Sequence, residues 1–389
     1  MKILFTAFVL FIVSVFSPAF AKKDKVPGIV VDYLPASSKT FIGSPSIAIL
    51  PNGDYVASHD FFGPASTENE KAMTAVFHSS DKGRSWNKIA EINGQFWSNL
   101  FVHRNDLYIM GTWKHHGNLI LRRSLDGGKS WSEPTDSIHG LLRIGEYHTA
   151  PMPMVIYKCR LCRAIENASS TTTAWGKRYS AMVISAPVDA DLLVASNWTT
   201  TNFLTYDSNY LNGNFGGWIE GNAVVTPEGK LIDFLRVETK ETGRDMAAIV
   251  NISEDLKSAS FDSLTGFLDF AGGARKFSIR YDDISKRYWA ITNQITSEFA
   301  LLPAGKVRNT LVLQSSLDLR NWTIHKVLLY HPDVLKHGFQ YVDWQFDGKN
   351  IIFLCRTAFD DAFGGADNYH NANYLTFHRI KDFRKFSSK

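Results

Sequence analysis

The sequence predicts an all-β protein built as a β-propeller, a ring of four-stranded sheets or blades, with seven blades preferred and six as the alternative. Two observations predict it. A turn motif occurs three times, and short β-rich runs separated by turns continue from residue 28 to residue 378. No long segment with the period of a helix interrupts them. A repeat on the order of 40–50 residues built on hairpins is typical of a propeller.

The repeated motif has the form Ser-x-Asp-x-Gly-x-Ser-Trp. Two full copies occupy residues 79–86 (SSDKGRSW) and 124–131 (SLDGGKSW), and a shortened copy occupies residues 316–322 (SLDLRNW). The Asp side chain is suited to accept hydrogen bonds from the N–H groups of its own turn. The Gly suits a position that needs a positive φ, and the Trp is expected to pack between neighbouring sheets. The motif is therefore structural and says little about chemistry.

These copies resemble the Asp-boxes of sialidase-like β-propellers, a resemblance that supports the architecture. At the usual blade length of about 50 residues, the chain after residue 21 divides into seven blades. In a ring of blades the last strand closes against the first. Residues 377–380 or residues 29–32 are expected to make that closure.

The first 21 residues have the pattern of a secretory signal. Lys2 is followed by an almost continuous apolar run, and residues 19–21 (AFA) match a small-x-small cleavage site. The apolar run is short for a membrane span. We therefore expect residues 1–21 to be removed, leaving residues 22–389 as a single propeller domain without a membrane span. The mature protein is expected to be secreted or periplasmic.

Charge and cysteine content narrow the function classes. The net charge is +4, and the Lys and Arg residues are scattered, so nucleic-acid binding has little support. The three cysteines, Cys159, Cys162 and Cys355, cannot all pair with one another, and buried packing or one disulfide is expected. No cluster of metal-ligand residues is present, so we expect no cofactor, although a calcium ion held by backbone carbonyls in the central channel stays open. We expect a monomer.

Arginine residues suggest a binding site for an acidic ligand. Arg163, Arg236, Arg280 and Arg356 each end or follow a strand in a different blade. Guanidinium groups that converge from several blades suit a carboxylate, which they bind through two parallel hydrogen bonds. For any single Arg the alternative is a surface or inter-blade salt bridge.

Other candidate residues lie in segments that suit neither a core nor a turn. The catalytic candidates are His116, Tyr147 and Arg163. The substrate-binding candidates are Trp97, His148, Trp218, Arg236, Arg280, Arg356 and Asn373.

An ordinary sialidase is the first comparison to consider, and the sequence argues against it. Sialidases are expected to open with Arg-Ile-Pro-Ser on the first inner strand. Here the equivalent run is Gly43-Ser44-Pro45-Ser46-Ile47, so Gly43 stands where the first carboxylate-binding Arg is expected.

The chain most resembles propeller enzymes that act on L-rhamnose-α-1,4-glucuronate ends: polysaccharide lyases, related ulvan lyases, and the family 145 glycoside hydrolases described as α-L-rhamnosidases. The resemblance rests mainly on residues 96–108, 122–124, 147–153, 163–166, 356–358 and 370–374.

This resemblance implies cleavage of a uronic-acid polysaccharide or oligosaccharide by β-elimination. Arg163 with Arg236 or Arg356 would neutralise the uronate carboxylate, and His116 and Tyr147 would exchange protons. As a base, Tyr147 would need its pKa lowered from about 10 by neighbouring positive charge. Hydrolysis of the same linkage is the alternative, and an exo-sialidase and a non-catalytic carbohydrate-binding propeller are further ones.

Overall fold

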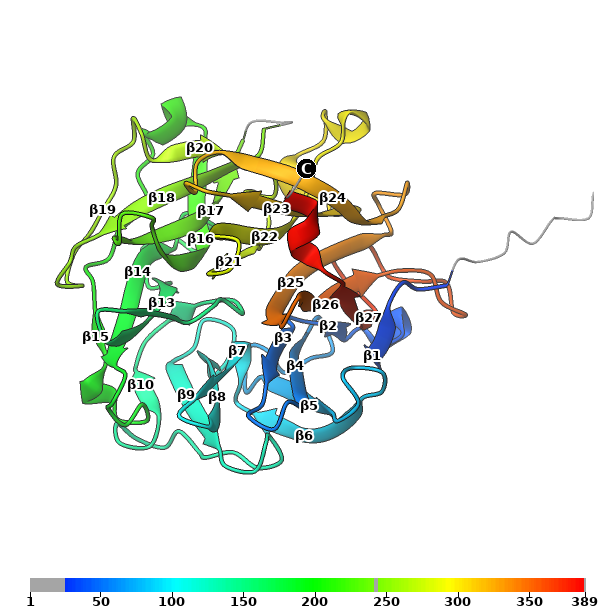
Figure 1. Cartoon of the computed structure of the whole chain (residues 1–389), viewed down its shortest axis with the longest axis horizontal. Helices are drawn as coiled ribbons and strands as arrows, with labels where there is room; N and C mark the ends of the chain where they lie inside the picture. Colours follow the sequence, from blue (N-terminus) through cyan, green and yellow to red (C-terminus); the bar gives the residue numbers. More distant parts are fainter. Residues whose placement is uncertain (1–24, 241–243, 388–389) are drawn as a thin grey trace, which may run out of the picture.

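The computed structural model describes residues 25–240 and 244–387, and these form six antiparallel sheets arranged around an axis (Figure 1). The propeller prediction is confirmed, but the preferred count of seven blades is wrong and the alternative of six is correct. The blades are longer than the usual length because long loops, such as residues 294–309 and 359–373, separate their second and third strands. The chain therefore makes six blades and not seven. The predicted signal, residues 1–21, lies outside the described residues.

Blades I to III follow one another along the chain, each starting with the strand nearest the axis. Blade I contains β2 (Phe41–Ile42), β3 (Ser46–Ile49), β4 (Tyr55–Phe62), β5 (Met73–Ser79) and β6 (Asn87–Asn93). Blade II contains β7 (Phe96–His103), β8 (Asp106–Thr112), β9 (Leu119–Ser124) and β10 (Leu141–Arg143). Blade III contains β11 (Tyr147–His148), β12 (Val155–Tyr157), β13 (Arg160–Asn167), β14 (Ser180–Pro187) and β15 (Thr199–Thr200).

The remaining blades repeat this order. Blade IV contains β16 (Phe215–Val225), β17 (Leu231–Thr239), β18 (Met246–Ile252), β19 (Ala259–Ser260) and β20 (Phe267–Asp269). Blade V contains β21 (Ser278–Asp282), β22 (Arg287–Asn293), β23 (Thr310–Ser316) and β24 (Trp322–Tyr330). Blade VI contains β25 (Gly338–Asp347), β26 (Asn350–Ala358), β27 (Tyr374–Ile380) and β1 (Ile29–Tyr33).

The helical segments among the described residues are short 3₁₀ turns. They are η1 (Ala36–Ser38), η2 (Ala195–Asn197), η3 (Tyr210–Gly213), η4 (Ser297–Phe299), η5 (Ala304–Lys306) and η6 (Phe383–Ser387). None of the helices in the described parts of the chain has the length and apolar character that a membrane crossing needs. The cysteines form no disulfide: Cys159 is exposed in a turn, and Cys162 and Cys355 are buried.

The ring closes through the two ends of the chain. β1 is the outermost strand of blade VI and pairs antiparallel with β27, so that Ile29 lies opposite Phe377 and Tyr33 opposite Tyr374. The two segments expected to make the closure therefore make it together. Val31 packs with Leu375 and Phe377 in a core that also contains residues of blade I. This core ties the first blade to the last.

The Asp-boxes adopt the predicted self-capped turns between the third and fourth strands of blades I, II and V. In the first, Asp81 accepts hydrogen bonds from the N–H groups of Arg84 and Ser85 at 2.9 and 3.0 Å, and Gly83 has a φ of +84°. Trp86 packs against Phe377 of blade VI with ring centroids 5.4 Å apart. The motif therefore fastens neighbouring blades, as predicted.

The antiparallel connections give the propeller two distinct ends. One end carries the loops between second and third strands, and we call it the upper end. These loops include residues 63–72, 113–118, 168–179, 294–309 and 359–373. We call the opposite one the Asp-box end, because the Asp-box turns lie there with the turns that join each innermost strand to the second. A side chain's position along its strand therefore decides which end it reaches.

The closure gives the first prediction. Val31→Asp places a carboxylate without a partner in the core between blades I and VI and is expected to cost about 2–4 kcal/mol. Val30→Asp is the matched control, because Val30 is 42% exposed. Thermal denaturation measures both variants. A Val31→Asp protein as stable as the control would show that the closure does not hold the ring.

Candidate functional site

Three innermost strands are kinked near the upper end. Trp97 on β7, Glu220 on β16 and Tyr341 on β25 have left-handed backbones, with φ values of +48°, +57° and +53°. Each lies at a bulge that shifts the strand pairing. Such a backbone conformation costs free energy for residues other than glycine, and it is found most often at functional sites. The kinks redirect three large side chains in alternate blades.

Glu220 and Tyr341 form a pair beside Arg236. Arg236 on β17 donates to Glu220 Oε2 at 2.8 Å and also bonds Glu238. Burial acts to raise the pKa of Glu220, but Arg236, His148 and a hydrogen bond from Tyr341 outweigh it and lower that pKa. Burial, reinforced by Glu220, raises the pKa of Tyr341. The pair at neutral pH is therefore a buried carboxylate next to a neutral phenol.

Two further guanidinium groups surround the Tyr341 ring. Arg308, in the loop before β23, lies with its guanidinium carbon 5.7 Å from the ring centroid, and Arg356 on β26 lies 4.9 Å away. Arg308 donates to Gly305 O and Gln340 Oε1, and Arg356 donates to His370 O. Both are at least 94% buried. Within the described residues neither forms an ion pair with a carboxylate, although buried charges are normally paired.

Glu68 is the carboxyl group suited to proton transfer at this end. It lies in the loop between β4 and β5, is partly exposed, and its carbonyl accepts the His115 N–H at 2.8 Å. Burial and the neighbouring Asp60 raise its pKa to about 7. Asp60 is itself buried, and its pKa rises to about 6, but its oxygens accept the N–H groups of Ser44 and Trp97. Asp60 therefore holds the backbone, while Glu68 stays available.

Aromatic and histidine side chains lie at the upper end of blades II and III. His148 bonds Glu166 through Nδ1 at 2.7 Å, and its ring lies 4.2 Å from that of Trp97. Arg178 donates to His116 Nδ1 at 3.1 Å, so the His116 proton lies on Nε2, which donates to Tyr179 at 2.9 Å. Burial and nearby positive groups lower the pKa of His116 to about 2. Its imidazole is therefore neutral.

The structure brings together five of the sequence-predicted residues and separates the other five. Near the upper end lie Trp97, His116, His148, Arg236 and Arg356. Four residues have structural surroundings instead, and a fifth, Arg280, lies toward the Asp-box end beside a cavity of about 850 Å³. The proposed meeting of guanidinium groups thus holds for Arg236 and Arg356 but not for Arg163 or Arg280.

The four structural residues correct the sequence interpretation. Arg163 is fully buried and donates to Met110 O, Thr149 Oγ1 and Ala150 O, joining blades II and III. Tyr147 packs in the core of the same blades, and burial raises its pKa, opposite to what a base needs. Trp218 lies in the core of blades III and IV. Asn373 fastens the loop of residues 359–373 by bonding the backbone of Phe359.

The sequence analysis did not identify Glu68, Glu220, Arg308 or Tyr341 as site residues. The positions of Glu220 and Tyr341 could have been found from the hairpins that contain them, because each lies close to a predicted Arg across its hairpin. Glu220 and Arg236 are equally distant from the turn at Pro227–Gly229, and Tyr341 and Arg356 from the turn at Gly348. Arg308 and Glu68 lie in loops, where no pairing rule applies. For metals, the described residues contain no group of three or more His, Cys, Asp or Glu side chains able to hold an ion.

No protein-family model matches the sequence, and no curated protein matches it. Solved structures match in fold. An α-L-arabinanase of Penicillium chrysogenum complexed with arabinobiose is 13% identical, with a TM-score of 0.54 over 92% of this chain and 98% of its own. An α-L-arabinofuranosidase of Fusarium graminearum is 10% identical, with a TM-score of 0.58 over 93% and 98%. A Hadza microbial sialidase is 14% identical, with a TM-score of 0.60 over 91% and 68%. The chain therefore has the six-bladed propeller fold found in these glycosidases.

The unpaired guanidinium groups give the second prediction. Arg308→Met leaves no described carboxylate without its partner but removes the hydrogen bonds to Gly305 O and Gln340 Oε1, so the loss of stability should be about 1–2 kcal/mol. Arg275→Met is the matched buried control. It removes the double contact of Arg275 with Asp245, at 2.7 and 3.0 Å, and should cost about 3–5 kcal/mol. Denaturant unfolding compares the two. Equal losses would show that Arg308 has a structural role.

Proposed function

We propose that the protein is a glycoside hydrolase that cleaves a glycan next to a sugar carrying a carboxylate. One observation carries the proposal: Arg308 and Arg356 are buried beside the Glu220–Tyr341 pair without a carboxylate partner among the described residues. An incoming carboxylate would supply the missing negative charge and accept paired hydrogen bonds. The likeness in fold to arabinanases and sialidases supports the glycosidase class.

Tyr341 is the proposed nucleophile and Glu220 its base. Glu220 accepts the Tyr341 proton while the phenol oxygen bonds to the anomeric carbon, a role known for tyrosine in sialidases. A neutral phenol approaches a sugar carboxylate without the repulsion that an anionic nucleophile would meet. Water then displaces the phenol oxygen, and the proton returns from Glu220 to Tyr341. The chemistry thus proceeds in two steps with a covalent intermediate.

Glu68 is the proposed acid for the leaving group. Protonated Glu68 gives its proton to the glycosidic oxygen as the bond to the anomeric carbon breaks. In the second step its carboxylate takes a proton from the attacking water. A pKa of about 7 suits both tasks near neutral pH. Because Glu68 lies on a loop of blade I, it reaches the site from the side opposite β16 of blade IV.

β-Elimination of a rhamnose–glucuronate linkage is the second candidate. The observation that favours it is the neutral imidazole of His116 at the same end, since neutral imidazole can accept a proton. The same guanidinium groups would neutralise a uronate carboxylate. Two facts weigh against it: the pKa of His116 is too low for a strong base, and Tyr147 is in the core. Hydrolysis of the same linkage, as by an α-L-rhamnosidase, falls within the main proposal. In either case, we propose a secreted or periplasmic location, on the signal pattern of residues 1–21.

A substrate panel separates these candidates. Gum arabic-type arabinogalactan and sialyllactose present acidic sugars, while arabinan is the neutral control. We expect sugar release from an acidic glycan without the ultraviolet absorbance of a conjugated uronate, and no release from arabinan. Release with absorbance would establish elimination. Cleavage of arabinan alone would contradict an acidic substrate, and binding without any turnover would favour a carbohydrate-binding protein.

The pH dependence tests Glu68. The acid form of Glu68 is lost as the pH rises through about 7, so kcat should fall on the alkaline side. Glu68→Gln should lower kcat by about 10²–10⁴-fold and abolish that alkaline limb. Glu70→Gln, at an exposed position of the same loop, is the control and should behave as wild type. An unchanged alkaline limb in Glu68→Gln would remove Glu68 from the mechanism.

A further inference from the structure

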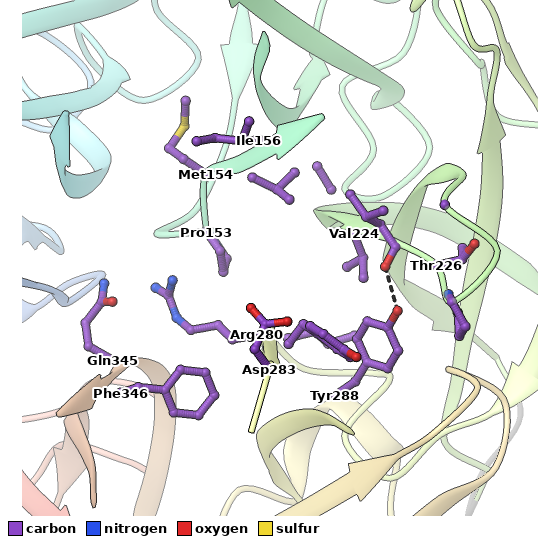
Figure 2. A pocket seen from close by; sticks show the side chains of 17 residues that line it. Pro153, Met154, Ile156, Val224, Thr226, Arg280, Asp283, Tyr288, Gln345 and Phe346 are labelled. Atoms are coloured by element: carbon purple, nitrogen blue, oxygen red, sulfur yellow. Dashed lines mark hydrogen bonds between the residues drawn. The ribbon is translucent and has the colours of Figure 1, made fainter. Parts of the chain in front are cut away.

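A cavity lies toward the Asp-box end, and its residue Gln345 is four residues after Tyr341 on β25. The cavity of about 850 Å³ is lined by β12, β16, β21 and β25 (Figure 2). A neighbouring cavity of about 500 Å³ is lined by β3 and β7 and shares Arg280, Gln345 and Phe346 with the first. The innermost strands of all six blades therefore border one hollow. Its size is within the range of ligand sites.

Arg280 is the positively charged side chain on the wall of this hollow. Its guanidinium lies over the Trp344 ring at 5.6 Å and contacts Asp343 Oδ1 at 3.3 Å. Figure 2 shows that the side chains of Arg280 and Gln345 extend into the same open space. The buried Nε atom of Arg280 has no hydrogen-bond partner among the described residues. Arg280 Nη2 donates to Asp343, and Gln345 Nε2 donates to Ile47 O at 3.0 Å. The second terminal nitrogen of Arg280 and the amide oxygen of Gln345 are therefore the groups left for a ligand.

Three positively charged side chains lie close together behind the cavity, and Asp343, Glu166 and Glu220 each act on one or more of them. Asp343 is the carboxylate that acts on Arg163, Lys276 and Arg280 alike. Its oxygens already accept bonds from Ser46 and the Trp344 N–H. Burial, with Arg280 and Arg163 nearby, lowers the pKa of Lys276 to about 8. A bound anion would relieve this crowding of like charges.

One carboxylate on the cavity wall, Asp283, offsets little of this positive charge. Its side chain is 88% exposed and forms an ion pair with Lys286 at 3.5 Å, so solvent screens its charge. The remaining wall is largely apolar. Tyr281 is 42% exposed and lies 4.8 Å from Tyr288, ring centroid to ring centroid, and Phe346 is partly buried. Exposed aromatic faces beside a few polar groups suit a sugar ring, whose faces carry C–H groups and whose edges carry hydroxyls.

We propose that this cavity is a second, non-catalytic binding site for an acidic oligosaccharide. Arg280 and Gln345 receive a sugar carboxylate and its neighbouring hydroxyls, and Tyr281 and Phe346 contact the ring faces. The choice of ligand class rests on the proposed function, because the same polymer would carry the acidic sugar to both ends of the propeller. A glycan chain held at the Asp-box end keeps further chain ends close to the enzyme.

The test is calorimetric titration with a glucuronate-terminated oligosaccharide prepared from gum arabic-type arabinogalactan. Arg308→Met removes binding at the upper end, and we expect one binding event to remain. Adding Arg280→Met should weaken that event by about tenfold or more. Tyr281→Ala is the second variant, because its half-exposed side chain can be truncated without leaving Asp343 unpaired. Each single variant of the Asp-box end should keep wild-type turnover of a short substrate.

The outcomes separate this proposal from the proposed function. A binding event that survives Arg308→Met and weakens in both Arg280→Met and Tyr281→Ala supports the second site, whether or not turnover is detected. Complete loss of binding in Arg308→Met alone overturns it while leaving the proposed function intact. Residual binding that neither Asp-box-end variant weakens also overturns it. Absence of turnover on every acidic glycan counts against the proposed function only.

Discussion

Buried carboxylates that hold kinked strands are the constraint on which the upper end depends. Asp60 accepts the Trp97 N–H at 2.6 Å, Glu166 accepts the Gly221 N–H at 3.1 Å, and Asp343 accepts the Trp344 N–H at 2.9 Å. Each bond fixes the backbone at or near a left-handed residue, a conformation that costs on the order of 1–3 kcal/mol. The rest of the ring is regular enough to stabilise these positions. The strain is thus concentrated where Glu220 and Tyr341 must be aimed.

The same carboxylates connect the two ends of the propeller. Glu166 bonds His148 as well as the Gly221 backbone, so the kink at Glu220 and the orientation of His148 depend on one side chain. Asp343 follows Tyr341 by two residues and contacts Arg280, which faces the opposite cavity. Asp343 therefore contributes both to the charge at the Asp-box end and to the backbone geometry near the upper end. The fold supplies a rigid frame, and the guanidinium groups near its two ends are the features left for ligands.

The sequence predicted the architecture because the Asp-box turns are local signals that repeat along the chain. The packing of Trp86 followed from the Asp-box, and the pairing of β1 with β27 followed from the need of a ring of blades to close. The predicted number of blades was wrong because the length of the loops varies, and no local feature of the sequence limits that length. Arg236 and Arg356 were predicted as site residues because a sugar acid is expected to bind guanidinium groups. Arg163 and Arg280 satisfied the same rule, and only their position along the strand separates them. Arg308 and Glu68 lie in loops that tertiary packing alone brings to the site.

The central claim is that Arg308 and Arg356 recognise a carboxylate on the substrate. The most direct measurement compares kcat/KM for an acidic glycan and for the same glycan after its carboxyl groups are reduced to alcohols. Wild type is expected to prefer the acid by about tenfold or more, and Arg308→Met to lose most of that preference, because charged hydrogen bonds are worth about 1.5–3 kcal/mol each. Equal kcat/KM values for the acid and its reduced form in wild type would contradict the account.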